Sequence, residues 1–287
     1  MKIVEKKLES RTTKTCSENK PLELYIFTDP LCFKCWSLEM VIKKLELEYS
    51  HYFTLSYILS CKISRLNPAC SGRKAKGGHP KTLLEYCLGS GREQERKNDP
   101  PFIASIAVKA AELQGKNKGI RFYRKLQEYL FYREMNITNP QTLIACAKEA
   151  GLDVEEFKKD IHSTSASKAF QCDLYVTNEM GVTDFPTVVM FTNNADEEGI
   201  KLTGNYPYEI YVKILREMLK REPEKSSLPP ILTYLKMQKW VTAKEISFVY
   251  DRPKFQVELE LKKLKLQKKV DRIKCERGEF WRYIGGD

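Results

Sequence analysis

The stretch Leu24-Tyr-Ile-Phe-Thr-Asp-Pro-Leu-Cys-Phe-Lys-Cys-Trp36 joins an apolar segment to two cysteines in C-x-x-C spacing. Leu24 to Phe27 are apolar or aromatic throughout, which is typical of a strand buried on both faces. From Trp36 the apolar residues recur every three or four positions, which predicts a helix over 36–50. Cys32 is therefore expected at the amino end of a helix, where backbone N–H groups stabilise a thiolate.

A second stretch, Gly181-Val-Thr-Asp-Phe-Pro-Thr-Val-Val-Met-Phe191, places a proline directly before another apolar strand. Proline is unusual there because it lacks the N–H that a sheet ladder uses. Thioredoxin-like folds place a cis-proline against the C-x-x-C pair, so we predict that Pro186 is cis and lies beside Cys32. A zinc site is disfavoured, because the sequence has no second C-x-x-C and no H-x-x-x-H pair.

The composition bounds the class of protein. The chain has 287 residues and a net charge of +11, with 14 basic and 8 acidic residues in 228–287 and 6 basic residues in 62–81. Such an excess favours acidic partners, either nucleic acid or an acidic protein face. Nine cysteines at irregular spacings, a polar stretch over 1–20 and no long apolar run predict a cytoplasmic protein with reduced thiols.

The order of patterns predicts an α/β fold. After a mobile lead-in over 1–20, strands are expected over 22–27 and 53–59 on either side of the first helix. Helices are then expected over 99–113, 120–131, 140–150, 154–161 and 165–180, with a short candidate over 82–88 in a long loop. Strands over 187–191 and 200–203 and a helix over 208–220 complete a thioredoxin-like domain over 21–220, with a helical insertion over about 80–180.

The pattern changes beyond a polar linker over 221–229. Helices are expected over 231–237, over 242–249 behind the Thr242 capping box, and from Pro253 to about Leu266 with Asp251 as cap. A hairpin is expected over 270–275 and 279–284, so residues 230–287 are predicted to form a winged-helix-like domain. Two sets of side chains should form its core: the stripe Val257, Leu261 and Leu264 with Phe255 as a candidate, and the aromatic residues Trp240, Phe248, Phe280 and Trp281.

The basic helix of this domain has two interpretations. It carries lysines that could follow a DNA backbone, with a basic residue on the wing. It lacks the Arg and Asn side chains that read bases, so a solvated basic face used for protein contact is favoured and DNA is an unlikely partner. The residues concerned are Lys254, Lys262, Lys263, Lys265 and Arg277.

The cysteine pair also has two interpretations. In one, Cys32 is an exposed nucleophilic thiol that Cys35 resolves, and the charge of Lys34 favours the thiolate. In the other, the pair is a retained feature of the fold. Either way a thioredoxin-type groove is expected, with Phe185-Pro186-Thr187 offering backbone groups to an extended peptide. The groove residues are Cys32, Phe33, Lys34, Cys35, Trp36, Phe185, Pro186 and Thr187.

The other cysteines give no clear site. Cys61, Cys70 and Cys87 lie near His79, but their spacing favours a basic loop with scattered thiols over a metal site. Cys146, Cys172 and Cys275 are expected in the core. We therefore predict neither a metal nor a cofactor.

The segment Asp29-Pro-Leu-Cys-Phe-Lys-Cys-Trp36 resembles the YjbH family, also called SpxH, a DsbA-like branch of the thioredoxin folds. The likeness covers nearly the whole chain. It continues through Ala110-Ala-Glu-Leu-Gln-Gly115, Asn136-Ile-Thr138, Glu156-Phe-Lys-Lys-Asp160, Gln171-Cys-Asp173, Ala243-Lys-Glu-Ile246 and Val249-Tyr-Asp251.

The resemblance implies a function that spacing cannot indicate. It implies a cytoplasmic adaptor, not an enzyme, that binds the transcription factor Spx and promotes its degradation by the ClpXP protease. The adaptor would stabilise Spx and expose its C-terminus to ClpX, and no cofactor is implied. Some members have a His- and Cys-rich N-terminus suited to zinc, whereas residues 1–20 here contain only Cys16 and no His.

Two alternatives remain open from the residues themselves. One is a cytosolic DsbA-like thiol-disulfide oxidoreductase that uses Cys32 and Cys35. The other is a redox-responsive DNA-binding protein. For the adaptor, we expect the thioredoxin core or the inserted helices to make the main contact with Spx, because the C-terminal domain is small.

Overall fold

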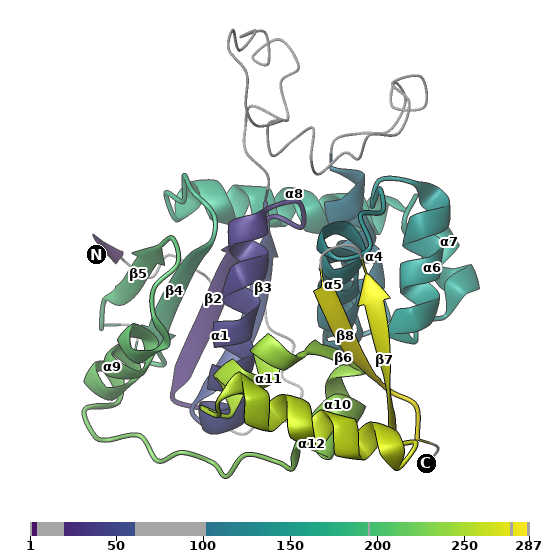
Figure 1. Ribbon diagram of the computed structural model, residues 1–287. Helices are drawn as coiled ribbons and strands as arrows, with labels where there is room; N and C mark the ends of the chain where they lie inside the picture. Colours follow the sequence, from purple (N-terminus) through teal and green to yellow (C-terminus); the bar gives the residue numbers. More distant parts are fainter. Residues whose placement is uncertain (1, 5–19, 61–101, 195, 276–277, 286–287) are drawn as a thin grey trace, which may run out of the picture. The chain divides into compact units, whose positions relative to one another are not determined.

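The computed structural model describes residues 2–4, 20–60, 102–194, 196–275 and 278–285 (Figure 1). It divides into two compact units, one formed by Met1–Trp36 and Thr54–Asn205 and the other by Ser37–Phe53 and Tyr206–Asp287. The predicted domain boundaries stay a prediction, because two compact units need not fold independently. Among the described residues, no helix is both long and apolar enough to cross a membrane.

The first unit is built on a five-stranded sheet. In it β2 (Leu22–Thr28) lies between β3 (Phe53–Leu59) and β4 (Thr187–Thr192), with β5 (Gly199–Thr203) and then β1 (Lys2–Val4) beyond β4. The pairs β2–β4, β4–β5 and β5–β1 are antiparallel. The Ser60 N–H donates to the Thr28 carbonyl at 2.8 Å, which joins the carboxyl ends of β3 and β2, so these two strands run parallel as predicted.

The predicted strands of this unit are confirmed within one residue at each end. Strand β1 was not predicted, and it corrects the mobile lead-in over 1–20 at residues 2–4. Its three residues carry too weak a pattern to be recognised alone, and pairing with β5 fixes them. Residues 5–19, including Cys16, lie outside the described residues.

In the described part of the insertion, from residue 102 onward, five helices follow, and most of their ends agree with capping signals. Asn139 caps α6 by accepting from the Gln141 N–H at 2.8 Å, and Gly151 ends that helix at φ +77°. Asp153 and Ser163 cap the next two helices. The bounds are α4 (Ile103–Leu113), α5 (Lys116–Phe131), α6 (Pro140–Ala150), α7 (Val154–Asp160) and α8 (Thr164–Glu179).

Helices α4 and α5 begin at other residues than predicted. Phe102 takes the cap position of α4 with no side-chain cap bond, so the helix begins a few residues later than the predicted start over 99–101. Helix α5 begins four residues before the predicted Ile120. The candidate helix over 82–88 lies outside the described residues, as do Cys61, Cys70, His79 and Cys87.

A buried carboxylate ties the insertion to the sheet. Asp173 of α8 accepts the Leu59 N–H of β3 at 2.7 Å and pairs with Lys109 Nζ of α4 at 2.6 Å. Burial nevertheless raises the pKa of Asp173 to about 6. One acidic side chain thus connects two helices and a strand.

Helix α1 (Phe33–Tyr49) begins three residues earlier than predicted and contributes Ser37 onward to the second unit. That unit also contains α9 (Tyr208–Leu219), and an irregular stretch follows at the predicted linker, residues 221–229. Within this stretch the Ser226 N–H donates to the Glu48 carbonyl at 2.8 Å. The Glu224 N–H donates to the Tyr52 hydroxyl at 3.1 Å, so the stretch is held to the end of α1.

The C-terminal part alternates helices and short strands. It contains three helices and a three-stranded antiparallel sheet in the order β6-β8-β7. Strand β6 was not predicted, and the winged-helix assignment itself stays a prediction. The bounds are α10 (Ile231–Gln238), β6 (Trp240–Thr242), α11 (Ala243–Val249), α12 (Lys254–Leu266), β7 (Val270–Cys275) and β8 (Gly278–Tyr283).

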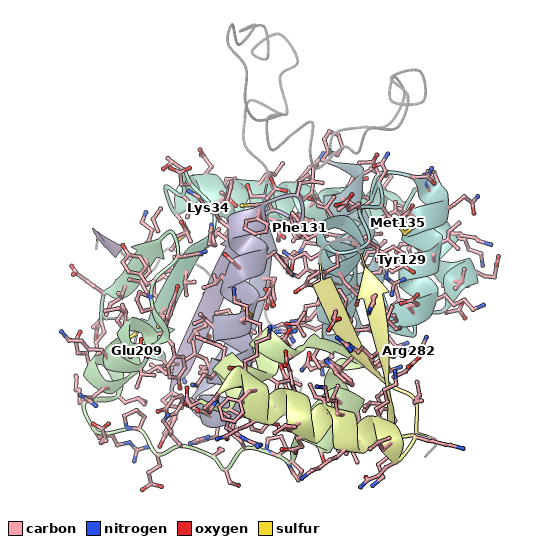
Figure 2. All side chains as sticks on the ribbon, in the orientation of Figure 1. Lys34, Tyr129, Phe131, Met135, Glu209 and Arg282 are labelled. Atoms are coloured by element: carbon pink, nitrogen blue, oxygen red, sulfur yellow. The ribbon has the colours of Figure 1, made fainter. Side chains whose placement is uncertain are left out.

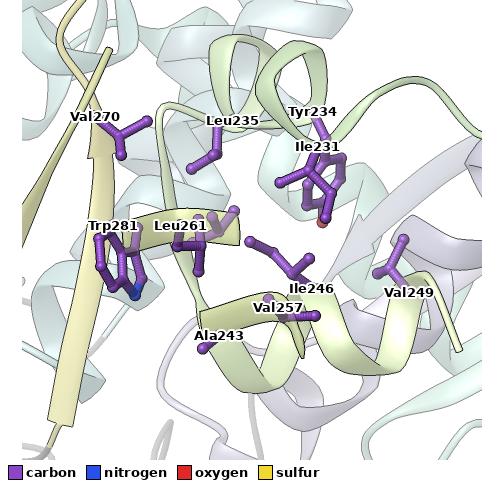
Figure 3. Packing of buried hydrophobic residues seen from close by; sticks show 11 residues of the cluster. Ile231, Tyr234, Leu235, Ala243, Ile246, Val249, Val257, Leu261, Val270 and Trp281 are labelled. Carbon is purple, nitrogen blue, oxygen red and sulfur yellow. The ribbon is translucent and has the colours of Figure 1, made fainter. Parts of the chain in front are cut away.

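The core of this part gathers side chains from all three helices and the sheet, as Figure 3 shows. The predicted stripe holds, with Val257 and Leu261 fully buried and Leu264 packed against them. The predicted candidate Phe255 is wrong, because its ring points to solvent. Phe280 and Trp281 are buried and Phe248 packs against the core, as expected.

Thr242 and Asp251 were both predicted as caps, and only the first is confirmed. Thr242 Oγ1 accepts from the Glu245 N–H at 3.0 Å. Asp251 adopts φ +49°, and Pro253 takes the cap position of α12. The Asp251 carboxylate instead accepts from Lys44 Nζ of α1 at 2.5 Å, so a long-range ion pair replaced the predicted local contact.

Glu245 is a second buried contact between α1 and the C-terminal part of the same unit. Its Oε1 accepts from Tyr234 Oη at 2.6 Å and from Lys43 Nζ at 2.9 Å. Glu245 and Tyr234 are both buried, so these contacts are shielded from water.

We expect Glu245→Ala to lower the free energy of unfolding by about 2–4 kcal/mol, because the buried Tyr234 hydroxyl loses this acceptor and Lys43 loses its counter-ion. Glu258→Ala is the matched control on α12, where the carboxylate pairs with Lys254 at 3.4 Å near the surface. The control should cost about 0.5 kcal/mol or less. Urea unfolding of both full-length variants measures the difference, and equal losses would contradict the assignment.

Candidate functional site

The two cysteines of the C-x-x-C pair lie at the start of α1. Cys32 precedes the helix, its N–H donates to the Asp29 carbonyl at 3.0 Å, and its own carbonyl accepts from Trp36 at 3.1 Å. Asp29 Oδ1 accepts from the Leu31 N–H at 2.8 Å, which closes the turn between β2 and α1. The predicted placement of Cys32 at a helix amino end is therefore confirmed.

The cis-proline lies where the sequence predicted it. The Phe185–Pro186 peptide bond is cis, and Cys32 Sγ donates to the Phe185 carbonyl at 3.9 Å. Cys32, Cys35 and Phe185 share one apolar cluster with Phe27, Val189 and Phe191. Two segments about 150 residues apart thus meet at the thiol pair.

The backbone at the cis-proline is largely engaged within the protein. The Phe185 carbonyl accepts from Cys32, and the Pro186 carbonyl accepts from the Gly204 N–H at 2.8 Å. Thr187 Oγ1 donates to the Asp184 carbonyl at 2.7 Å. A peptide that used these carbonyl groups would compete with existing hydrogen bonds, so the predicted groove stays a proposal.

Both thiols are free, and Cys32 is less accessible than one of the two interpretations expected. Cys32 is only 9% exposed, and Cys35 is more deeply buried. Cys32 is therefore nearly buried, whereas the nucleophile interpretation expected it to be exposed. A reagent reaches this sulfur only over a small area.

The two thiols have pKa values shifted in opposite directions. A hydrogen bond from the Cys35 thiol is the largest effect on Cys32 and lowers the pKa of Cys32 from 9.0 to about 7, although burial opposes it. Burial raises the pKa of Cys35 well above its usual value. Lys34 contributes through its backbone N–H, whereas we expected its ammonium group to contribute. Cys32 is therefore the thiol of the pair that ionises first, with Cys35 as the hydrogen-bond donor to its thiolate form.

A chain of buried hydrogen bonds supports Cys35 from behind. The Thr28 hydroxyl bonds Cys35 and lies 2.6 Å from the Tyr123 hydroxyl, which accepts from Gln127 Nε2 at 2.7 Å. Each hydroxyl has one proton. Either hydroxyl of the Thr28–Tyr123 pair can donate to the other, and Thr28 connects this pair to Cys35.

This chain was not foreseen from the sequence. Thr28 ends β2 and lies close to the cysteines in sequence, but Tyr123 and Gln127 belong to α5 of the insertion. A tyrosine and a glutamine four residues apart do share one helix face, which is the only local signal. Gln127 Oε1 is buried and has no hydrogen-bond partner among the described residues.

An aromatic cluster borders the thiol pair and was only half predicted. The Trp36 ring stacks on Phe131 at 5.3 Å between centroids and meets Tyr132 edge-on at 4.7 Å. Phe33 lies 5.6 Å from Phe131, and nearly half of its surface is exposed. Figure 2 shows Phe131 beside the first turn of α1. The end of α5 therefore adds two rings to the predicted groove residues.

The remaining cysteines differ in accessibility. Cys146 is buried in α6, as predicted, whereas Cys172 on α8 is exposed, so its predicted core position is wrong. Cys275 ends β7, and its side chain lies outside the part that the structure describes. Among the described residues, no three His, Cys, Asp or Glu side chains gather in a way that could hold a metal ion.

The basic helix α12 offers little for reading DNA. Lys254 pairs with Glu258 at 3.4 Å and Lys265 approaches Asp271 at 3.6 Å, while Lys262 and Lys263 are exposed. Phe255 and Leu259 occupy the outer face of the helix. A face with apolar side chains fits a protein contact better than a phosphate backbone. Arg277 lies outside the described residues.

Comparison with protein families gives a match over the thioredoxin-like part. A family model described as "Thioredoxin" matches residues 25–213. This range contains the C-x-x-C pair, the inserted helices and the cis-proline strand.

Curated relatives match almost the full length. The ClpXP adapter protein SpxH of Bacillus cereus is 46% identical over 279 residues, which cover 93% of this chain and 92% of that protein. SpxH of Bacillus subtilis is 42% identical over 273 residues, covering 92% and 90% of the two chains.

Solved structures resemble only part of the chain. A putative protein disulfide isomerase from Nitrosomonas europaea has a TM-score of 0.51 at 20% identity, covering 70% of this chain and 96% of its own. A probable DsbA oxidoreductase from Streptomyces coelicolor has a TM-score of 0.50 at 15% identity, covering 73% and 93%. At this identity the likeness confirms the DsbA-type thioredoxin fold with its helical insertion.

We expect Cys32 in the reduced protein to become reactive toward iodoacetamide with a midpoint near pH 7, because its thiolate forms near its pKa of about 7. Cys35→Ala removes the donor and should move the midpoint upward, while Cys35→Ser keeps a hydroxyl donor and should move it less. Mass spectrometry of the Cys32 peptide follows the reaction. An unchanged midpoint in Cys35→Ala would show that Cys35 does not stabilise the thiolate.

Tyr123→Phe tests the chain behind Cys35. It removes one hydroxyl from the chain, so we expect the Cys32 midpoint to rise and the free energy of unfolding to fall by about 1–2 kcal/mol. Tyr57→Phe is the control, because that ring lies 5.2 Å from Tyr123 but its hydroxyl accepts from Arg124 instead. If both variants shift the midpoint equally, the effect comes from packing and not from the hydrogen-bond chain.

Proposed function

Because the chain belongs to the thioredoxin family and, within it, to the family of the ClpXP adapter protein SpxH, we propose that it is an adaptor that promotes degradation of the transcription factor Spx by ClpXP. It binds Spx without chemical change, stabilises it in a complex and exposes its C-terminus to ClpX. Its place of action is the cytoplasm, where that protease would meet its substrate.

The observation that carries this proposal is the difference in coverage between two groups of relatives. The adaptors match 93% of this chain, including the C-terminal part, whereas the disulfide isomerase matches 70% of it while covering 96% of its own length. The remaining part of this chain thus has no counterpart in that oxidoreductase. A region that the adaptors share and that lies outside the match to this oxidoreductase favours the adaptor function.

The fold leaves room for a second function, a cytosolic DsbA-like thiol-disulfide oxidoreductase. The pKa of Cys32, lowered to about 7 by Cys35, favours it, because thiolate is available at neutral pH. The small exposed area of Cys32 disfavours it, since a protein disulfide must approach the attacking sulfur. The adaptor function needs neither property.

The main contact with Spx is proposed on the thioredoxin-like core or the inserted helices. This unit exposes several large apolar side chains, which is where a protein partner gains most from burial. They are Phe33 beside the thiol pair, and Leu113, Met135 and Tyr175 on or near the insertion. Of these, Phe33 belongs to the predicted groove and extends the aromatic cluster toward solvent.

Point variants test this better than a deletion of residues 228–287. Residues Ser37–Phe53 of α1 and its following turn belong to the same compact unit as that region. A deletion would remove Asp251, the partner of buried Lys44, and Glu245, the partner of half-buried Lys43, so loss of binding would also follow from misfolding.

We expect the double variant Cys32→Ala, Cys35→Ala to accelerate ClpXP degradation of Spx as well as the unchanged protein does, because an adaptor acts through its surface. A reconstituted assay with purified ClpX, ClpP and Spx measures the rate with and without each protein. Insulin reduction on the same samples measures thiol chemistry, and there the double variant should be inactive. Loss of both activities would favour the oxidoreductase, and no acceleration by the unchanged protein would refute the adaptor.

A further inference from the structure

Helix α12 presents two apolar faces, and the fold uses one of them. Val257 and Leu261 point into the core of the C-terminal part. On the opposite face Phe255 is 62% exposed, Leu259 54% and Leu266 85%. These three residues are spaced by four and seven positions, so they lie in one line along the helix.

Lys262 completes this line. It lies three residues after Leu259 and four before Leu266, and it is exposed. A lysine can lay its aliphatic chain along apolar neighbours and keep its charge in water. Phe255, Leu259, Lys262 and Leu266 together form what we call the outer face of α12.

The charges around the outer face are mostly positive. Glu258 pairs with Lys254 on the helix and Glu260 pairs with Arg252 just before it, so both acidic side chains have a basic partner nearby. Lys263 and Lys265 lie in the last turn, where positive charge interacts favourably with the negative carboxyl end of the helix. This interaction explains part of the excess of basic residues on α12. Lys262 lies earlier, in the middle of the apolar line, so its charge is not explained by an interaction with the carboxyl end of the helix.

We propose that the outer face of α12 docks an acidic amphipathic helix of a partner protein. Apolar residues at intervals of four and seven match the seam along which two helices pack. The lysines beside that seam complement acidic side chains flanking the apolar stripe of the partner. This surface goes beyond the proposed Spx contact, since it lies on another part of the chain.

DNA fits the outer face less well. A helix that reads DNA places polar side chains on base edges and basic ones on phosphates. Here phenylalanine and leucine occupy the centre of the exposed face, and burial against another apolar surface is what they gain from. DNA is therefore an alternative outcome of the test.

The test uses the full-length protein and three fluorescent peptides of about 18 residues, long enough to form a helix. The first contains Leu, Ala and Glu with leucines spaced by three and four. The second has the same composition in shuffled order, and the third has Lys in place of Glu. Fluorescence anisotropy should give a Kd for the first peptide at least about tenfold lower than for the other two.

Two variants at exposed positions locate the binding. Leu259→Glu should raise the Kd of the first peptide by about tenfold or more, because it places a like charge in the apolar line. Met237→Glu on α10 is the control, with 58% exposure in the same part of the chain, and it should change the Kd by less than about twofold. Circular dichroism and thermal unfolding confirm that both variants fold.

Several results would overturn the proposal. These are equal binding of ordered and shuffled peptides, an unchanged Kd in Leu259→Glu, or equal losses in both variants. Tighter binding of a DNA duplex of about 20 base pairs, retained in Leu259→Glu, would also overturn it in favour of nucleic acid.

The Spx degradation assay separates this surface from the proposed function. A protein that accelerates degradation but does not bind the acidic peptide would overturn the docking surface and leave the adaptor function standing. A protein that binds the peptide through Leu259 but does not accelerate degradation would refute the adaptor function and leave the docking surface standing.

Discussion

Helix α1 buries charged side chains, and a buried charge is tolerated only where another group compensates it. Lys44 and Glu48 of this helix are nearly inaccessible to water. Lys44 donates hydrogen bonds to the Asp251 carboxylate and the Phe248 carbonyl. Glu48 accepts a hydrogen bond from the Tyr208 hydroxyl and forms an ion pair with Lys225. All four partners follow about 160 residues or more later in the chain. This requirement explains why the greater part of α1 belongs to the same unit as the C-terminal region.

Sequence reasoning succeeded where local chemistry decides the structure. The helix over 140–150 and the Thr242 capping box are fixed by bonds to residues within a few positions and were predicted, as was β3 at both ends. It failed where a distant contact decides, because no pattern encodes the partner. Asp251 looks like a cap until Lys44 is known, and three-residue β1 is a strand only beside β5. In the candidate site, the thiols and cis-proline were predictable, while Tyr123, Gln127, Phe131 and Tyr132 depended on how the insertion packs.

The chain combines features that are usually discussed separately. It keeps a thioredoxin-type pair of thiols, in which the pKa of Cys32 is lowered to about 7 by its hydrogen bond with Cys35 and the pKa of Cys35 is raised by burial. It also encloses that pair among apolar and aromatic side chains, which leaves Phe33 as the accessible neighbour. The match to the adaptor relatives covers 93% of this chain, so it extends beyond the thioredoxin-like part that holds this site.

The exposed thiol of Cys172 complicates any measurement of oxidation in this protein. Cys172 is exposed on α8 whereas Cys32, Cys35 and Cys146 are buried, so a colorimetric reagent or mild peroxide would modify it alongside the thiol pair. Two molecules joined through this position would form a covalent dimer that an electrophoresis gel could not distinguish from a regulated one. Studies of oxidative stress on this protein should therefore begin from a chain in which serine replaces that cysteine.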